Sequence, residues 1–191
     1  MRRYDPTLTT HNFVYHRRMM NRDPETEINS GMDATGEPVT IAPARFRELW
    51  QLRTLQRRSF RRGLAYSIGT LMLLWALPST PFIVARQGDR VLGSAIGDQN
   101  SGLSRVINIC VDPDARRHGI GERLLSALEA ALPTGDMLLM VQEENTPARR
   151  LYEKQGYLSV GVGRNYYGKG QNGIWMRKQR GNSDGEGRLF V

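Results

Sequence analysis

Cysteine, histidine and lysine are scarce in this chain of 191 residues. The one cysteine, Cys110, has no partner for an internal disulfide, and it excludes a structural zinc site of the CxxC type. The three histidines are scattered, so no metal site is expected. Lysine supplies only 3 of the 27 basic residues, and with 19 acidic residues the formal net charge is +8. This charge suits a phosphate-bearing cofactor or RNA, but it also suits solubility, so charge alone decides nothing.

Two kinds of targeting signal are also missing. No apolar stretch follows the arginines near the start, so we expect no secretory leader and a cytoplasmic location. Residues 63–85 carry no charge and would meet the length criterion of about 20 residues for a membrane span. Pro78 and Pro81 divide this segment, so we expect no membrane association there. We predict instead a buried helix over residues 66–77 and a short strand over residues 82–85.

The composition indicates one folded domain, because 39% apolar and 24% charged residues are ordinary for a globular protein. Residues 1–36 mix polar residues without periodicity, and we expect a flexible arm there with at most a short helix over residues 14–20. The domain is expected over residues 37–179, and residues 180–191 are expected to form a polar tail.

Hydrophobic periodicity predicts an α/β layered domain with a mixed sheet. Strands are predicted over residues 39–41, 82–85, 91–96, 105–111, 137–141, 158–163 and 174–177. Helices are predicted over residues 44–58, 66–77, from about 119 to 132, and 147–154.

Two of these elements carry a predicted orientation. In the helix over residues 44–58 we expect four side chains to face the core, namely Phe46, Leu49, Trp50 and Leu52. In the strand over residues 105–111, Ile107, Ile109 and Val111 are expected on one face and Cys110 on the other.

Residues 111–125 (VDPDARRHGIGERLL) contain the most informative motif. A strand ends at Val111, and a short turn then enters an amphipathic helix through Gly119 and Gly121. Glycines let a ligand approach the backbone, and free N–H groups at a helix N-terminus favour an anion. We call residues 112–122 the anion loop and expect it to hold a phosphate or pyrophosphate. The alternative is that the glycines merely cap the helix.

Other nucleotide-binding motifs are absent from the sequence. It contains no G-x-G-x-x-G fingerprint and no Walker lysine, which argues against a Rossmann site and against nucleotide hydrolysis.

A second motif lies at residues 137–157, where a strand leads into a helix. Asn145 and Thr146 are suitable N-cap residues and Pro147 suits the first helical turn. Taken alone, this motif is explained by capping and by packing of Tyr152.

Together the two motifs resemble the GNAT superfamily of acyl-CoA-dependent N-acetyltransferases. Arg116, Gly119 and Gly121 match its Q/R-x-x-G-x-G/A motif, which here follows Val-Asp-Pro. The second motif matches N-x-x-A-x-x-x-Y followed by G-F/Y, through Asn145, Ala148, Tyr152, Gly156 and Tyr157. The resemblance is strong over residues 107–157 and extends over about residues 38–178. The closing region, residues 164–167 and 175–176, looks like that of ribosomal-protein-alanine N-acetyltransferases.

This resemblance implies the GNAT fold, a mixed and mostly antiparallel sheet splayed at its centre with helices on both faces. It implies that acetyl-CoA is the cosubstrate and that Asn145 hydrogen-bonds its pantetheine arm. Tyr152 is implied to contact the cosubstrate and, as the catalytic acid, to protonate the leaving thiolate. The strand backbone is implied to pair with that arm through Ile109, Cys110 and Val111. The amides implied to bind the pyrophosphate are those of Arg116, Arg117, His118, Gly119, Ile120, Gly121 and Glu122.

The acceptor is less clear from the sequence. Tyr166 and Tyr167 either line the acceptor site or pack as hairpin cover. Met140 stands where protein N-terminal acetyltransferases carry a Glu or His base, so deprotonation must use water or another residue, or the substrate differs. A covalent route through Cys110 is disfavoured because that residue alternates into the core.

We therefore expect direct transfer of an acetyl group to a primary amine, such as a protein N-terminus, in a ternary complex. A small-molecule amine is the alternative acceptor, and a silent acyl-CoA-binding or RNA-associated module is the alternative class. Nucleic acid is expected as a partner only through a ribosomal substrate.

Overall fold

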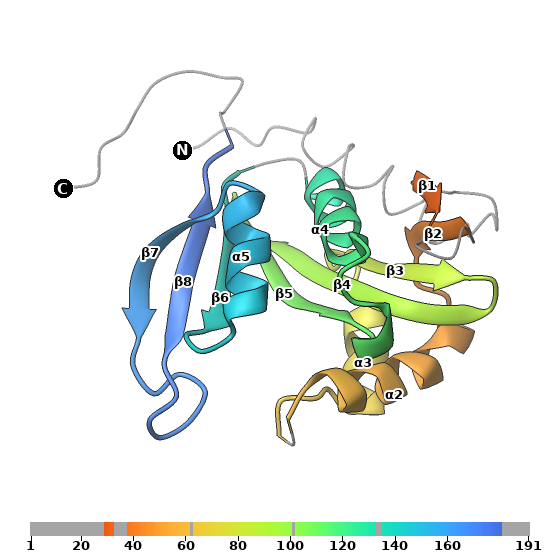
Figure 1. The fold of residues 1–191 in the computed structure, drawn as a ribbon, viewed down its shortest axis with the longest axis horizontal. Helices are drawn as coiled ribbons and strands as arrows, with labels where there is room; N and C mark the ends of the chain where they lie inside the picture. The colour runs from red at the N-terminus through yellow and green to blue at the C-terminus, as the bar shows by residue number, and fades with distance from the viewer. Residues whose placement is uncertain (1–28, 33–37, 62, 101, 133–134, 181–191) are drawn as a thin grey trace, which may run out of the picture.

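The computed structural model describes residues 29–32, 38–61, 63–100, 102–132 and 135–180. In this part of the chain eight strands form one sheet in the order β1-β2-β3-β4-β5-β6-β8-β7 (Figure 1). The strands are β1 (Asn29–Met32), β2 (Pro38–Pro43), β3 (Phe82–Gln87), β4 (Arg90–Asn100), β5 (Leu103–Val111), β6 (Met137–Gln142), β7 (Leu158–Gly163) and β8 (Gly173–Lys178). The helices are η1 (Phe46–Glu48), α2 (Leu49–Ser59), α3 (Ile68–Ala76), η2 (Pro113–Ala115), α4 (Ile120–Ala131) and α5 (Thr146–Lys154).

The sheet opens at its one parallel pair. Neighbouring strands are antiparallel except β5 and β6, which pair only over Ser104–Val106 and Met137–Leu139. Beyond these three residue pairs the two strands diverge, so the ends of both strands have an open backbone edge. This confirms the mixed, mostly antiparallel sheet splayed at its centre.

Helices cover both faces of the sheet, as expected. On one face, α4 and α5 pack on a core that includes Leu124, Leu128 and Tyr152. On the other face, α2 and α3 pack on a second core that includes Leu52 and Leu71. Close packing of α4 on β4 needs a strand residue without a side chain, because a Cβ at Gly97 would lie 2.7 Å from Leu132 Cδ1.

A β-bulge in β5 changes the orientation predicted for that strand. Ile96 of β4 pairs with Asn108 and Gly97 pairs with Val106, which leaves Ile107 without a partner on β4. The extra residue shifts the alternation, so Ile107 packs with Cys110 in the α2 core and not with Ile109 and Val111. The placement of Ile107 on the same face as Ile109 was therefore wrong.

The first two predicted helices differ from the structure. Phe46 lies in the short helix η1 and not in α2. Its ring packs edge-to-face on Trp75, with the ring centroids 5.4 Å apart. Phe46 is 52% and Trp50 55% exposed, so neither faces the core. Trp50 lies off the buried stripe of α2, because that stripe is set by Leu49, Leu52 and Gln56.

The helix predicted over residues 66–77 forms over Ile68–Ala76 but is not buried. Leu71 is its one fully buried residue, and Leu73 is 61% exposed. This helix is apolar on every side, so its sequence does not show which face meets α2. Among the described residues, no helix has both the length and the hydropathy needed to cross a membrane.

One strand lies inside the segment expected to be an arm. β1 pairs antiparallel with β2 at the edge of the sheet, with Ser30 opposite Thr40. Its sequence, Asn-Ser-Gly-Met, has no alternation that would have predicted a strand. The helix predicted over residues 14–20 and most of the tail predicted over residues 180–191 lie outside the described residues.

Candidate active site

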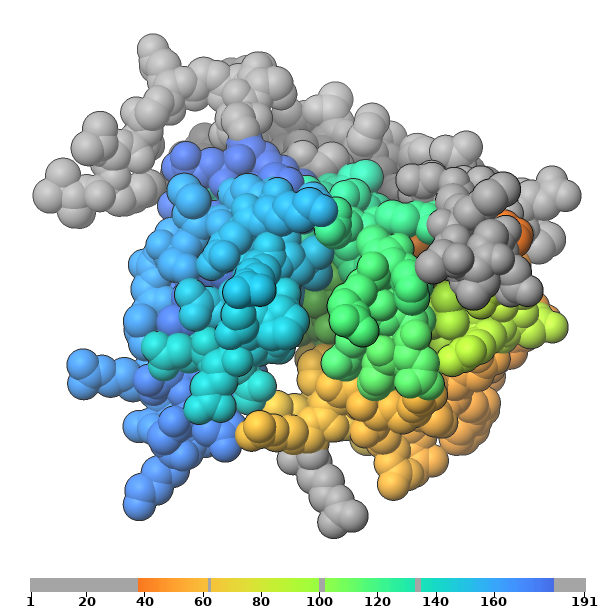
Figure 2. Space-filling model, in the orientation of Figure 1, coloured from red at the N-terminus to blue at the C-terminus, as the bar shows by residue number. Residues whose placement is uncertain are grey.

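A cleft of about 530 Å³ lies where β5 and β6 diverge. Figure 2 shows the α5 half of the molecule in cyan and blue beside the α4 half in green. The walls come from the exposed edges of β5 and β6, from α5, from the segment between α2 and α3, and from the segment between β7 and β8. The lining residues used below are Phe60, Tyr66, Arg105, Ile109, Met140, Gln142, Asn145, Tyr152, Tyr166, Tyr167 and Trp175.

The anion loop presents a row of free amides before α4. Gly119 is the N-cap of α4 with φ 73°, and Arg117 is also left-handed with φ 67°. From Arg116 to Glu122, no amide donates to a backbone carbonyl of a described residue, and the first such bond runs from Arg123 N to Gly119 O. Because the helix dipole also favours negative charge here, this loop can bind an anion.

The two motifs meet at the start of α4. A Cβ at Gly121 would lie 3.3 Å from Leu151 Cδ2, so this glycine lets α4 approach α5 closely. Arg116, Arg117 and His118 are exposed beside the free amides and add positive charge. Of the strand residues expected to pair with a pantetheine arm, Ile109 lines the cleft, and Cys110 and Val111 follow it on β5.

Asn145 caps α5. Its side-chain oxygen accepts a hydrogen bond from Ala148 N at 3.3 Å, and Pro147 lies in the first turn. Asn145 is exposed at the edge of the cleft, so the cap also brings a polar side chain to the divergence of β5 and β6. Its contact with a cosubstrate remains a prediction.

Tyr152 projects from α5 to the cleft and is only 5% exposed. Its ring packs against Tyr157, with the centroids 5.7 Å apart. Burial, together with the nearby Tyr167, raises the pKa of the Tyr152 phenol well above its usual value of about 10. The phenol therefore stays protonated at neutral pH and can donate a proton or a hydrogen bond.

Cys110 faces the opposite core. Gln56 Nε2 donates to its sulfur at 3.5 Å, and Ser94 Oγ lies 3.4 Å away. Burial raises the pKa of the Cys110 thiol to about 11, so almost none is thiolate at neutral pH. A covalent acetyl-cysteine is therefore not supported by the geometry.

Aromatic residues from β8 and from the segment between β7 and β8 form one wall of the cleft. Tyr167 Oη donates to Met140 O at 3.0 Å, and the Tyr166 ring packs edge-to-face on Tyr167 and Trp175. Burial, with a smaller effect of neighbouring tyrosines, raises the pKa of Tyr167 to about 12. Both tyrosines therefore line the cleft and also pack on neighbouring rings, and their contact with an acceptor remains a prediction.

The cleft has no side chain suited to act as a general base. Among the described lining residues there is neither a carboxylate nor a histidine, and Arg105 is the one charged residue. Arg105 Nε donates to Asp98 Oδ1 at 2.8 Å. The Met140 side chain lies against the hairpin of β7 and β8, since a Cβ at Gly163 would be 3.0 Å from Met140 Cε. Glu143, which follows β6, is exposed and accepts a hydrogen bond from Asn172 Nδ2 at 2.9 Å.

Two lining residues had no signal in the sequence and no role predicted for the cleft. Phe60 and Tyr66 come from the segment around the end of α2, far from both motifs. An aromatic residue after a basic helix is common, so only the fold shows that Tyr66 reaches the cleft.

The fold and the cleft define an acyltransferase of the GNAT class, and comparison with known proteins agrees. Residues 78–158 match the acetyltransferase (GNAT) domain family. The chain is 30% identical to the N-alpha-acetyltransferase RimI of Mycobacterium tuberculosis over 155 residues, which cover 78% of this chain and 98% of that one. It is 28% identical over 143 residues to an uncharacterized N-acetyltransferase of Methanocaldococcus jannaschii, covering 73% of this chain and 90% of that protein.

Solved structures show the same fold. The ribosomal-protein-S18-alanine N-acetyltransferase of Escherichia coli superimposes with a TM-score of 0.69 at 25% identity, covering 80% of this chain and 99% of that one. The chain belongs to the GNAT acetyltransferases and is an N-acetyltransferase.

Proposed function

We propose that the protein transfers the acetyl group of acetyl-CoA to the α-amine at the N-terminus of a peptide or protein. The observation that carries this proposal is the cleft between β5 and β6, whose described lining is rich in tyrosine and includes the open edge of β5, together with the amides before α4 that bond no described backbone carbonyl. The relative from Mycobacterium tuberculosis is named an N-alpha-acetyltransferase, and the Escherichia coli protein is named an alanine N-acetyltransferase of ribosomal protein S18.

The residues at the donor end fit CoA. Its pyrophosphate would accept hydrogen bonds from the amides of Arg116 to Glu122. Its pantetheine arm would pair with the open edge of β5 at Ile109–Val111, where β6 no longer pairs. Asn145 stands at the mouth of that opening and would bond the amides of the arm.

Tyr152 supplies the proton in the proposed reaction. The amine nitrogen attacks the thioester carbon, the carbon–sulfur bond breaks, and the sulfur takes the proton of the Tyr152 hydroxyl. The phenolate then regains a proton from the newly formed amide nitrogen through water. Holding both reactants in one cleft supplies much of the rate, because it removes the entropy of their encounter.

The lack of a base favours an α-amine as acceptor. With neither a carboxylate nor a histidine among the described residues that line the cleft, the proposed reaction depends on the fraction of amine that is already neutral. At pH 7.5 about one third of an α-amine is neutral, whereas only about 0.1% of a lysine ε-amine is, given pKa values of about 7.8 and 10.4. The cleft therefore discriminates against ε-amines by a few hundredfold, roughly, before any contact with the acceptor side chain.

The test is an assay of the purified protein with acetyl-CoA and two matched peptides. One peptide has a free N-terminus and no lysine, and the other has a blocked N-terminus and one lysine. Mass spectrometry should find acetylation of the first peptide only. Acetylation of the lysine at a similar rate, or of small amines but neither peptide, would contradict an N-terminal acceptor. A cytoplasmic location remains a prediction.

A further inference from the structure

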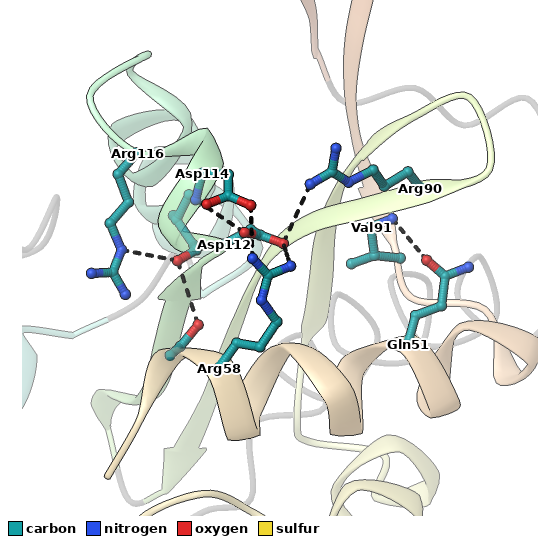
Figure 3. Close-up of polar contacts among 9 residues, drawn as sticks. Gln51, Arg58, Arg90, Val91, Asp112, Asp114 and Arg116 are labelled. Atoms are coloured by element: carbon teal, nitrogen blue, oxygen red, sulfur yellow. Dashed lines mark hydrogen bonds and ion pairs between the residues drawn. The ribbon is translucent and has the colours of Figure 1, made fainter.

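An arginine on α2 joins that helix to the start of the anion loop (Figure 3). Arg58 Nη1 donates to Asp112 Oδ2 at 2.9 Å, and Arg58 Nη2 donates to Asp114 Oδ2 at 2.7 Å. We call these three residues the Arg58 clamp. The side chain of Asp112 is only 6% exposed, and Arg90 Nη2 lies 3.6 Å from the same oxygen.

The carboxylate at the centre of the clamp also shapes the loop. Asp112 Oδ1 accepts from Asp114 N at 3.1 Å, which caps η2 and turns the chain away from β5. Ser59 Oγ, next to Arg58, lies 3.4 Å from Val111 O, and Arg116 Nε donates to the same carbonyl at 3.2 Å. The last turn of α2 therefore contacts both the end of β5 and the first residues of the anion loop.

The conformation of the anion loop requires such support. Arg117 has φ 67°, which is disfavoured for a residue with a side chain and persists only when the surroundings impose it. Gly119 is left-handed as well, so two of the three residues before α4 have a positive φ. The contacts that fix the start of this loop are those of Asp112 and Asp114.

We propose that Arg58 is a positioning residue for the acyl donor, which holds the anion loop against α2 so that its free amides face the pyrophosphate. This inference rests on the proposed function, because acetyl-CoA is the donor it assumes. The helix ends at Ser59, and the segment that follows it contributes Phe60 and Tyr66 to the lining of the cleft. Arg58 thus connects the donor end of the cleft to this segment.

The guanidinium group is required for this role, not only its charge. A guanidinium presents a planar fork that bonds two carboxylates at once, whereas an ammonium is a single point charge. Arg58→Lys keeps the positive charge near the anion loop but cannot reproduce both bonds. Comparing Ala and Lys at this position separates positioning from simple attraction of the anion.

The experiment measures CoA binding by titration calorimetry for the wild type, Arg58→Ala, Arg58→Lys and Arg57→Ala. Arg57 is the matched control, since it is exposed on the same turn and its loss also removes one charge. Loss of a hydrogen-bonded charge pair should raise the Kd for CoA about tenfold in Arg58→Ala. Arg58→Lys should show most of this increase in Kd, and Arg57→Ala should change Kd by less than about twofold. Asp114→Asn, which alters the exposed side of the clamp, should raise Kd by about threefold and tests the proposal if Arg58→Ala folds poorly.

Activity with a truncated donor separates positioning from general damage. S-acetylpantetheine lacks the pyrophosphate, so Arg58→Ala should keep its kcat/KM with this donor and lose about tenfold with acetyl-CoA. Three results would overturn the proposal: an unchanged Kd in Arg58→Ala, full recovery in Arg58→Lys, or an equal loss with both donors. If the wild type itself does not bind CoA, the donor assignment fails, whereas normal wild-type binding with an unaffected Arg58→Ala refutes only the role of Arg58.

Discussion

Replacing Tyr152 by phenylalanine removes one oxygen and leaves the ring in place. Phenylalanine keeps the contact with Tyr157, and the Tyr152 hydroxyl bonds no described residue, so the free energy of unfolding should change by less than about 1 kcal/mol. The acetyl transfer step loses its proton donor, and kcat should fall about 100-fold, or about 2.7 kcal/mol of activation free energy. The Kd for CoA should stay within about twofold, because the pyrophosphate contacts lie on the anion loop and not on α5.

Tyr157→Phe is the matched control for that change. Its hydroxyl donates to Glu129 Oε1 at 2.9 Å, outside the cleft, so this variant should lose about 1 kcal/mol of stability and keep its kcat. The assay follows thiol release under single-turnover conditions, with acetyl-CoA and with an acetyl thioester of a more acidic thiol. The more acidic thiol needs less help from a proton donor to leave. With this thioester, the rate of acetyl transfer by Tyr152→Phe should therefore be closer to the wild-type rate. A kcat for Tyr152→Phe within about threefold of wild type would refute the assignment of Tyr152 as the acid.

Four further outcomes are expected. The kcat/KM should rise with pH up to the pKa of the acceptor α-amine, about 7.7–8.0, and should follow that pKa when the peptide is changed; a fixed inflection would indicate a base on the enzyme. Because the pKa of Tyr167 is raised to about 12, ionisation of this residue should cause no loss of activity below pH 10. Gly119→Ala forces a side chain into a left-handed position, so thermal melting should show a loss of about 1 kcal/mol and calorimetry weaker CoA binding. Leu124→Ala empties a fully buried position between α4 and the sheet and should lower the free energy of unfolding in urea by about 2–5 kcal/mol.

Local signals in the sequence were sufficient for much of the fold. The stripe of leucines in α4 is periodic and β6 is a short apolar run, and each element was predicted close to its observed bounds. The bulge at Ile107 depends on how β5 pairs with β4, and no property of Ile107 itself reveals it. The exposure of Leu73 was missed for a similar reason, since an apolar helix does not show which of its sides will meet a neighbour.

The candidate site likewise combines a feature of one local segment with features that depend on the fold. The anion loop is defined by consecutive residues, because free amides at a helix start are a property of that one segment. The aromatic wall of the cleft is assembled from residues around Tyr66 and Tyr167, which are about a hundred positions apart in the sequence. Motif spacing therefore predicted where an anion would bind, but it left the acceptor side as an open question.

The short pairing of β5 with β6 has a mechanical consequence. Only three residue pairs connect β5 to β6. Few backbone hydrogen bonds therefore join the rest of the sheet to the part formed by β6, β7 and β8, which α5 accompanies. A donor whose arm pairs with Ile109–Val111 would stiffen this junction, because it adds backbone hydrogen bonds where β5 and β6 do not pair. Amide hydrogen exchange should then slow along the ends of β5 and β6 when CoA binds, and the two halves of the molecule should respond to force as one body.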